Sequence, residues 1–137
     1  MNSKPIIYLT WVARIVAAAI MLQTLYFKFT GAEESIYIFT TVGMEPWGRI
    51  GVGVMELVAS LLIIIPATSW IGAGIALGLM VGAMGMHLTI LGIEVQGDGG
   101  YLFFLALMVA VCSAFILWVN KELVFGFINK VIGKKSA

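Results

Sequence analysis

Long apolar stretches separated by short polar segments dominate this chain. Four of the stretches are close to the roughly 20 residues that an α-helix needs to cross a bilayer. They cover residues 6–27, 47–65, 70–91 and 101–119. Pro46 suits the first turn of the second stretch and Pro66 suits its end, because proline has no N–H to donate within a helix. The pattern predicts an all-α integral membrane protein built as a four-helix bundle.

Two further segments are too polar to span. Residues 31–42 mix apolar and polar side chains, which predicts a short surface helix between the first two spans, although the alternation of apolar residues leaves a strand open. Residues 121–135 place Leu123, Val124, Phe127, Ile128 and Val131 on one helical face. This is the pattern of an interfacial amphipathic helix. A frayed extension of the fourth span is the alternative.

Glycines recur along the third span. Gly74, Gly78 and Gly82 are four residues apart, which matches the small-xxx-small pattern that lets membrane helices approach closely. We therefore expect Gly78 and Gly82 to face another helix.

Composition supports a membrane protein of one domain. Of the 137 residues, 61% are hydrophobic and 11% are charged, whereas soluble domains are about half apolar and a quarter charged. The net charge of +1, without a basic patch among aromatic residues, argues against a nucleic-acid partner. Cys112 is the only cysteine and His87 the only histidine. We therefore expect no disulfide within the chain and no metal site.

Charge also predicts the orientation. Four spans place both chain ends on one side, with Lys4, Lys121, Lys130, Lys134 and Lys135. The other side carries Lys28 and Arg49 among five acidic residues. The positive-inside rule therefore places both termini in the cytoplasm.

Glu56 is the residue that an apolar span tolerates least. A carboxylate there must face the bundle interior and find a partner. Arg14 and Lys28 are the best candidates, because their spacing is close to four helical turns and puts them on one face of the first span. We expect Glu56 to be ionised and paired with one of them. Arg14 is favoured, because its planar guanidinium matches a carboxylate.

These residues predict a polar pocket in the outer half of the bundle. Its expected members are Arg14, Lys28, Glu56 and His87, with Arg49 and Asp98 in secondary positions. Two interpretations stay open: the buried charges only fix the helix register, or the pocket binds a small ligand or relays protons. His87 at a helix end is expected either to bond the backbone of a loop or to take part in such a site.

The order and spacing of several short motifs resemble the DoxX-like family of small four-helix membrane proteins. The matching residues are Arg14, Lys28, the 53–57 segment around Glu56, the 87–89 segment with Leu91 and Gly92, and the glycine-rich 97–103 segment.

The resemblance implies a multi-pass protein of the bacterial cytoplasmic membrane. The family takes its name from a thiosulfate:quinone oxidoreductase subunit. It thus implies a membrane subunit or quinone-interacting partner of redox-enzyme subunits, with a bound quinone or lipid as its ligand. Two other functions stay open: a small-molecule or ion carrier, which the short chain without an inverted repeat argues against, and a purely structural anchor. Besides the bilayer, a second copy of the chain is a candidate partner.

Overall fold

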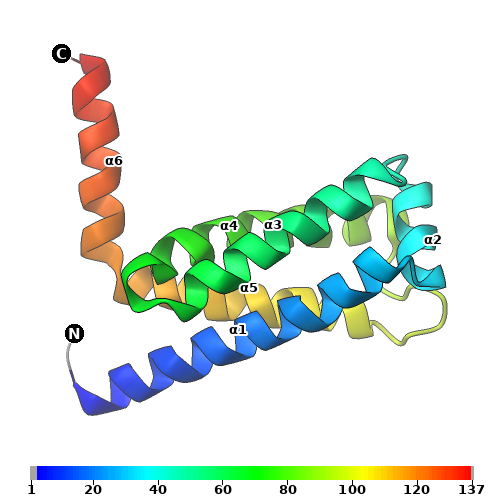
Figure 1. Cartoon of the computed structure of the whole chain (residues 1–137), viewed down its shortest axis with the longest axis horizontal. Helices are drawn as coiled ribbons and strands as arrows, with labels where there is room; N and C mark the ends of the chain where they lie inside the picture. Colours follow the sequence, from blue (N-terminus) through cyan, green and yellow to red (C-terminus); the bar gives the residue numbers. More distant parts are fainter. Residues whose placement is uncertain (1–2, 137) are drawn as a thin grey trace.

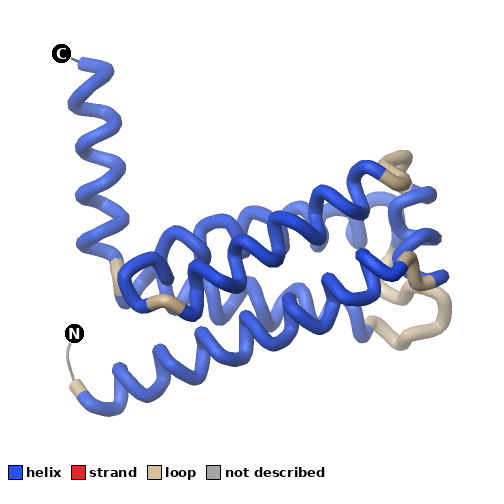
Figure 2. Tube along the Cα trace, in the orientation of Figure 1, coloured by secondary structure: helices blue, strands red, loops and turns tan. Residues whose placement is uncertain are grey.

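The computed structural model describes residues 3–136, and these form helices joined by short turns (Figure 2). The helices are α1 (Lys4–Thr30), α2 (Glu33–Thr41), α3 (Trp47–Ile64), α4 (Ser69–Met86), α5 (Tyr101–Val119) and α6 (Lys121–Ser136). A single 3₁₀ turn, Pro66–Thr68, joins α3 to α4, and a π-helical turn, His87–Leu91, extends α4. No strand occurs among the described residues, so the strand alternative for 31–42 is wrong.

Four helical segments are long and apolar enough to cross a membrane, which confirms the predicted all-α architecture of four spans. The fourth coincides with the predicted 101–119. The first runs past the predicted 6–27 at both ends. It starts beside Pro5 in the first turn, and it stops where Gly31 takes a left-handed conformation with φ of 69°.

The spans form a closed ring in which α1 packs on α3, α3 on α4, α4 on α5 and α5 on α1. Small side chains fill the centre: Ala17, Ala59, Ala73 and Ala76 are fully buried around Ile63. One glycine makes the closest helix approach. A Cβ on Gly72 would lie 2.7 Å from the carbonyl oxygen of Ala59 and from the backbone nitrogen of Ile63.

The glycines expected to face a neighbouring helix do not. No atom lies within 4 Å of a Cβ built on Gly74, Gly78 or Gly82. The expectation is wrong because α4 packs through the face that carries Gly72, Ala73 and Ala76, whereas these three glycines lie on an exposed face of the same helix. Gly72, which makes the close contact, is not part of the four-residue repeat.

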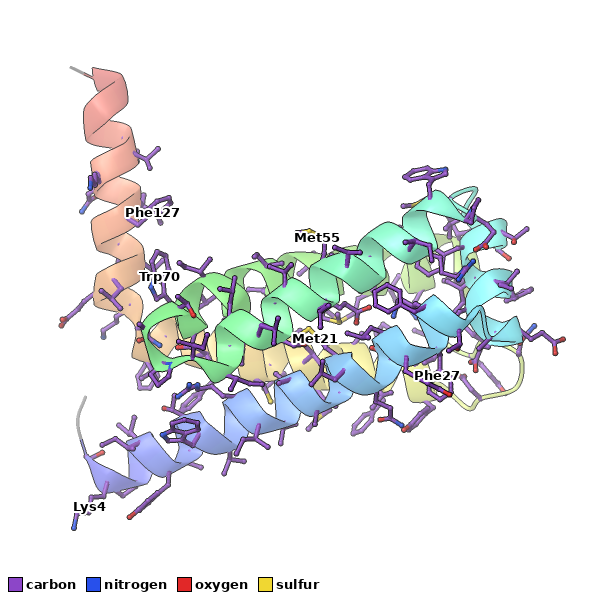
Figure 3. All side chains as sticks on the ribbon, in the orientation of Figure 1. Lys4, Met21, Phe27, Met55, Trp70 and Phe127 are labelled. Atoms are coloured by element: carbon purple, nitrogen blue, oxygen red, sulfur yellow. The ribbon has the colours of Figure 1, made fainter. Side chains whose placement is uncertain are left out.

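The two ends of the bundle differ (Figure 1). The start of α1, the turn between α3 and α4, and α6 lie at one end, and α2 and the 92–100 loop lie at the other. α6 turns away from the bundle after Asn120, whose side-chain amide donates to the Ile116 carbonyl at 2.8 Å. The Phe127 ring packs near the Trp70 ring at the start of α4, with centroids 5.8 Å apart (Figure 3). A separate helix turned away from the spans fits the interfacial prediction better than an extension of α5. The side chains of Lys134 and Lys135 lie outside the described part.

Candidate functional site

Glu56 lies in the middle of α3 with 1% of its surface exposed. Its Oε1 atom is 2.7 Å from the Lys28 ammonium nitrogen on α1. The Thr24 hydroxyl, one turn before Lys28, lies 2.9 Å from the other carboxylate oxygen. That hydroxyl is also 3.1 Å from the Met21 carbonyl, but a hydrogen bond to a charged acceptor is the stronger one. The expectation that Glu56 pairs with a base of the first span is confirmed for Lys28.

The end of α1 is held against α3 by two contacts that position Lys28. The absence of a side chain on Gly53 admits the Phe29 ring, because a Cβ there would come within 2.7 Å of it. Arg49 donates through one terminal nitrogen to the Lys28 carbonyl. Its Nε is 2.9 Å from Glu45, which is one turn earlier on the chain. A guanidinium at a helix C-terminus satisfies a carbonyl without an intrahelical partner and complements the helix dipole. Arg49 therefore holds Lys28 in place from its backbone side.

Lys28 and Glu56 line a cavity of about 480 Å³ in the half of the bundle nearest α2. All four spans contribute to its wall, and α2 covers the end of it with residues such as Glu34, Ser35 and Phe39. Apolar side chains from every span make up most of the lining, including Ile20, Val52, Leu79, Met86, Leu105 and Val109. Ligand pockets in proteins are commonly of this size and apolar character, with a few fixed polar groups.

His87 opens the π-helical turn and is 5% exposed. Its Nδ1 atom is 3.0 Å from the Gly92 carbonyl oxygen, and its ring packs edge-on against Phe103. Because a carbonyl only accepts, Nδ1 carries the hydrogen and donates it. No hydrogen bond joins Nε2 to any of the described residues, and His87 lines the cavity. π-helical turns are frequent at functional sites.

Arg14 lies away from this cavity and does not contact Glu56, so the favoured pairing is wrong. Its Nε donates to the Ile63 carbonyl at 2.7 Å, and a terminal nitrogen donates to the Ile64 carbonyl. The guanidinium also lies 3.8 Å from the centre of the Trp11 ring. α3 ends just before Pro66, so its last carbonyls lack intrahelical donors, and water cannot replace these donors inside a bilayer. Arg14 supplies them and is 4% exposed.

Asp98 shapes the 92–100 loop at the α2 end. Its carboxylate accepts from the backbone amides of Val95 at 3.0 Å, Gly100 at 2.8 Å and Leu102 at 3.2 Å. Burial on its own raises the pKa of Asp98, but these amide donors outweigh it and bring the pKa below its ordinary value. Burial, followed by repulsion from Asp98, raises the pKa of Glu34 above its ordinary value. Glu34 therefore holds its proton more tightly than a free glutamate does.

A family model for DoxX matches residues 9–91 of the chain. The chain belongs to the DoxX family. The match runs from within α1 to the end of the π-helical turn, and so includes Arg14, Lys28, Arg49, Glu56 and His87. The 92–100 loop and α5 lie beyond it, although α5 completes the ring. No curated protein matches the chain, and no solved structure does either.

Thr24 and Glu34 are among the polar residues of this DoxX site that sequence reasoning missed. Thr24 shares the carboxylate of Glu56 with Lys28, and Glu34 reaches the cavity from α2. The spacing of Thr24 and Lys28, one helical turn, was a usable signal. Most hydroxyls in helices bond their own backbone, however, as Thr10 does with the Ile6 carbonyl at 2.6 Å. Among the described residues, no three His, Cys, Asp or Glu side chains come together as metal ligands.

Proposed function

We propose that this DoxX protein is a membrane subunit or partner of a redox system that holds a quinone in the cavity beside Lys28 and Glu56. The observation that carries the proposal is a buried ion pair in the wall of a cavity of about 480 Å³ whose remaining lining is mostly apolar. A quinone combines a flat apolar ring with carbonyl acceptors, which suits this lining.

Lys28 is the group expected to recognise the quinone. An ammonium has three donors, and Glu56 is the one carboxylate within 4 Å of it among the described residues. Its side chain is 17% exposed and lines the cavity, so a donor is left for a ligand carbonyl. Glu56, whose carboxylate also accepts from the Thr24 hydroxyl, holds the ammonium in position. A partner subunit exchanges electrons with the quinone in this proposal.

The proposed orientation rests on charge, and the proposed membrane rests on the family. We propose that the protein lies in the bacterial cytoplasmic membrane with both chain ends in the cytoplasm. Lysines accompany the end that bears α6, and the acids Glu33, Glu34, Glu94 and Asp98 accompany the α2 end. The positive-inside rule supports this orientation, in which the cavity lies on the outer side.

The experiment measures quinone binding to the purified protein and to a variant without the ion pair. Native mass spectrometry from mild detergent reports bound quinone and partner subunits, and titration with a short-chain quinone gives the affinity. Lys28→Met alone strands a buried carboxylate, so the test uses Lys28→Met combined with Glu56→Gln. Lys121→Met at the start of α6 is the matched control.

We expect the double variant to keep a folded bundle but bind quinone about tenfold or more weakly, since a hydrogen bond to a charged group contributes about 1.5–3 kcal/mol. Lys121→Met should bind as the unmodified protein does. An unchanged affinity in the double variant would contradict the proposal and favour a structural role for the pair. Uptake of a solute into liposomes, with no quinone bound, would favour a carrier instead.

A further inference from the structure

We propose that the cavity opens sideways into the bilayer between α3 and α4, along Gly78 and Gly82. Its ligand is then an amphiphile dissolved in the membrane, whose polar head lies at His87 and whose apolar tail leaves along these two glycines, here called the glycine seam. The inference deepens the proposed function by naming the kind of ligand and its route. It rests on that function only for the identity of the head group.

The first observation is that Gly78 and Gly82 on α4 line the cavity and are exposed at the same time. At Gly72, α4 touches the α3 backbone so closely that even a methyl group would clash with Ala59 and Ile63. At Gly78 and Gly82, further along α4, nothing lies within 4 Å of the position that a Cβ would take. Both glycines are exposed, and both line the cavity. The missing side chains therefore leave an opening where any larger residue would form a wall.

The second observation is an unpartnered polar atom in the same cavity. His87 is 5% exposed. Its Nδ1–H donates to Gly92, and in the neutral imidazole the other ring nitrogen, Nε2, is an acceptor. A head group that carries a hydroxyl, as the reduced form of a quinone does, could donate to Nε2, so His87 points to a ligand with a donor.

The depths of these groups match the two ends of an amphiphile. Counting from Leu91 at about 1.5 Å per residue, His87 lies about 6 Å, Gly82 about 14 Å and Gly78 about 20 Å along the helix. A bilayer has a hydrocarbon core about 30 Å thick. The polar acceptor thus lies near the head-group level and the glycine seam lies at the level of the acyl chains.

The end of the cavity toward the aqueous side is covered. Phe39 of α2 is 6% exposed and lines the cavity together with Ala32, Glu34 and Ser35. A tailed molecule already in the leaflet can enter through the seam without moving this cover. The other side of the cavity, between α1 and α5, carries bulky residues such as Phe27, Leu105 and Tyr101. That side is the competing route.

The first test closes the seam. Gly78→Leu and Gly82→Leu place a side chain in the opening, and Gly74→Leu is the matched control, because it lies on the same helix face and does not line the cavity. The protein is placed in phosphatidylethanolamine–phosphatidylglycerol vesicles. Two photoreactive hydroquinones serve as probes, one with a decyl tail and one with a methyl group in its place.

We expect Gly78→Leu and Gly82→Leu to reduce labelling by the tailed probe about tenfold, which corresponds to about 1.4 kcal/mol. Labelling by the tail-less probe should persist, and Gly74→Leu should leave both unchanged. Equal labelling by the tailed probe in all three variants would overturn the inference. If Leu105→Trp loses labelling and the two seam variants keep it, the probe enters between α1 and α5. That result would also overturn the inference.

The second test needs no ligand. A spin label attached to cysteine in Gly82→Cys, in a Cys112→Ser background, should collide with dissolved oxygen and not with a water-soluble nickel chelate. Access to the nickel chelate would show that the opening faces water and would overturn the inference. The two proposals can fail separately. If the seam is open to lipid but the protein binds no quinone, only the proposed head group is refuted. If quinone binding is the same in the seam variants as in the unmodified protein, only the lateral route is refuted.

Discussion

Arg14 and Lys28 stand on the same face of α1, yet each satisfies a different part of α3. Lys28 neutralises the Glu56 side chain, and Arg14 caps the backbone carbonyls of Ile63 and Ile64. Seven residues separate Glu56 from Ile63, which is about 10 Å along a helix. The two interactions are therefore independent, and mutational coupling should separate them.

A double-mutant cycle tests this separation. We expect Lys28→Met and Glu56→Gln each to destabilise the bundle, Lys28→Met by about 3–5 kcal/mol because it leaves a buried charge without its partner. The combined variant should lose much less than the sum of the two. Arg14→Gln with Glu56→Gln should instead be additive to within about 0.5 kcal/mol. Unfolding in detergent measures all five variants, and coupling between Arg14 and Glu56 as large as that of Lys28 with Glu56 would contradict the structure.

Glu34 should make stability depend on pH. Burial and the nearby Asp98 raise its pKa, so the folded state binds the proton more tightly than the unfolded state does. As pH rises from the ordinary pKa of a glutamate to the raised one, the unfolded state loses its proton first and the free energy of unfolding falls. Glu34→Gln removes this loss, so the variant should gain stability relative to the unmodified protein across that window. Thermal unfolding as a function of pH measures it. Glu33→Gln, on an exposed neighbour, is the control, and an equal gain there would contradict the assignment.

At the scale of single residues, the sequence predicted that Glu56 is paired but not its partner. The need for a partner follows from hydropathy, which is a local property of the chain. The choice between Arg14 and Lys28 depends on which turn of α1 lies beside Glu56. It also depends on the backbone carbonyls left without donors before Pro66. The side chains of these residues do not indicate that their carbonyls need a donor.

The elements themselves were largely predictable. The four spans and both additional helices follow from the lengths of the apolar stretches and from Pro46, Pro66 and Gly31, which act on the backbone locally. The role of the α4 glycines was not predictable in the same way, because small residues permit a close contact and an empty space equally well. Gly72 lies on the face of α4 that is buried against α3, whereas Gly78 and Gly82 lie on an exposed face, and the tertiary structure decides which face is buried.

Three glycine-to-alanine variants on α4 test this difference. Gly72→Ala should destabilise the bundle by about 1–3 kcal/mol, because the new methyl group overlaps the α3 backbone. Gly78→Ala and Gly82→Ala should be neutral or stabilising by up to about 1 kcal/mol, since alanine is the better helix former and has free space there. Thermal unfolding in one detergent compares the three. A greater loss at Gly82 than at Gly72 would contradict the packing described.

At the scale of the whole molecule, the arrangement of the spans predicts which segments share a side of the membrane. Single cysteines introduced at Glu33 on α2 and at Lys130 on α6, both exposed positions, should react from opposite sides in intact cells when Cys112 is replaced by serine. A membrane-impermeant maleimide should label the first only. Labelling of both from outside would contradict the four-span topology, and labelling of the Lys130 position alone would reverse the proposed orientation.

The contacts of α1 with α3 also bear on how the protein enters the membrane during synthesis. Arg14 and Lys28 find their acceptors only on residues that the ribosome adds later, Glu56, Ile63 and Ile64. Until then α1 would carry an unpaired guanidinium deep in the bilayer, at a cost of about 2.5–3.5 kcal/mol on the insertion scale. We therefore expect α1 to be retained at the translocon until α3 is complete, so that the two helices leave it as a pair.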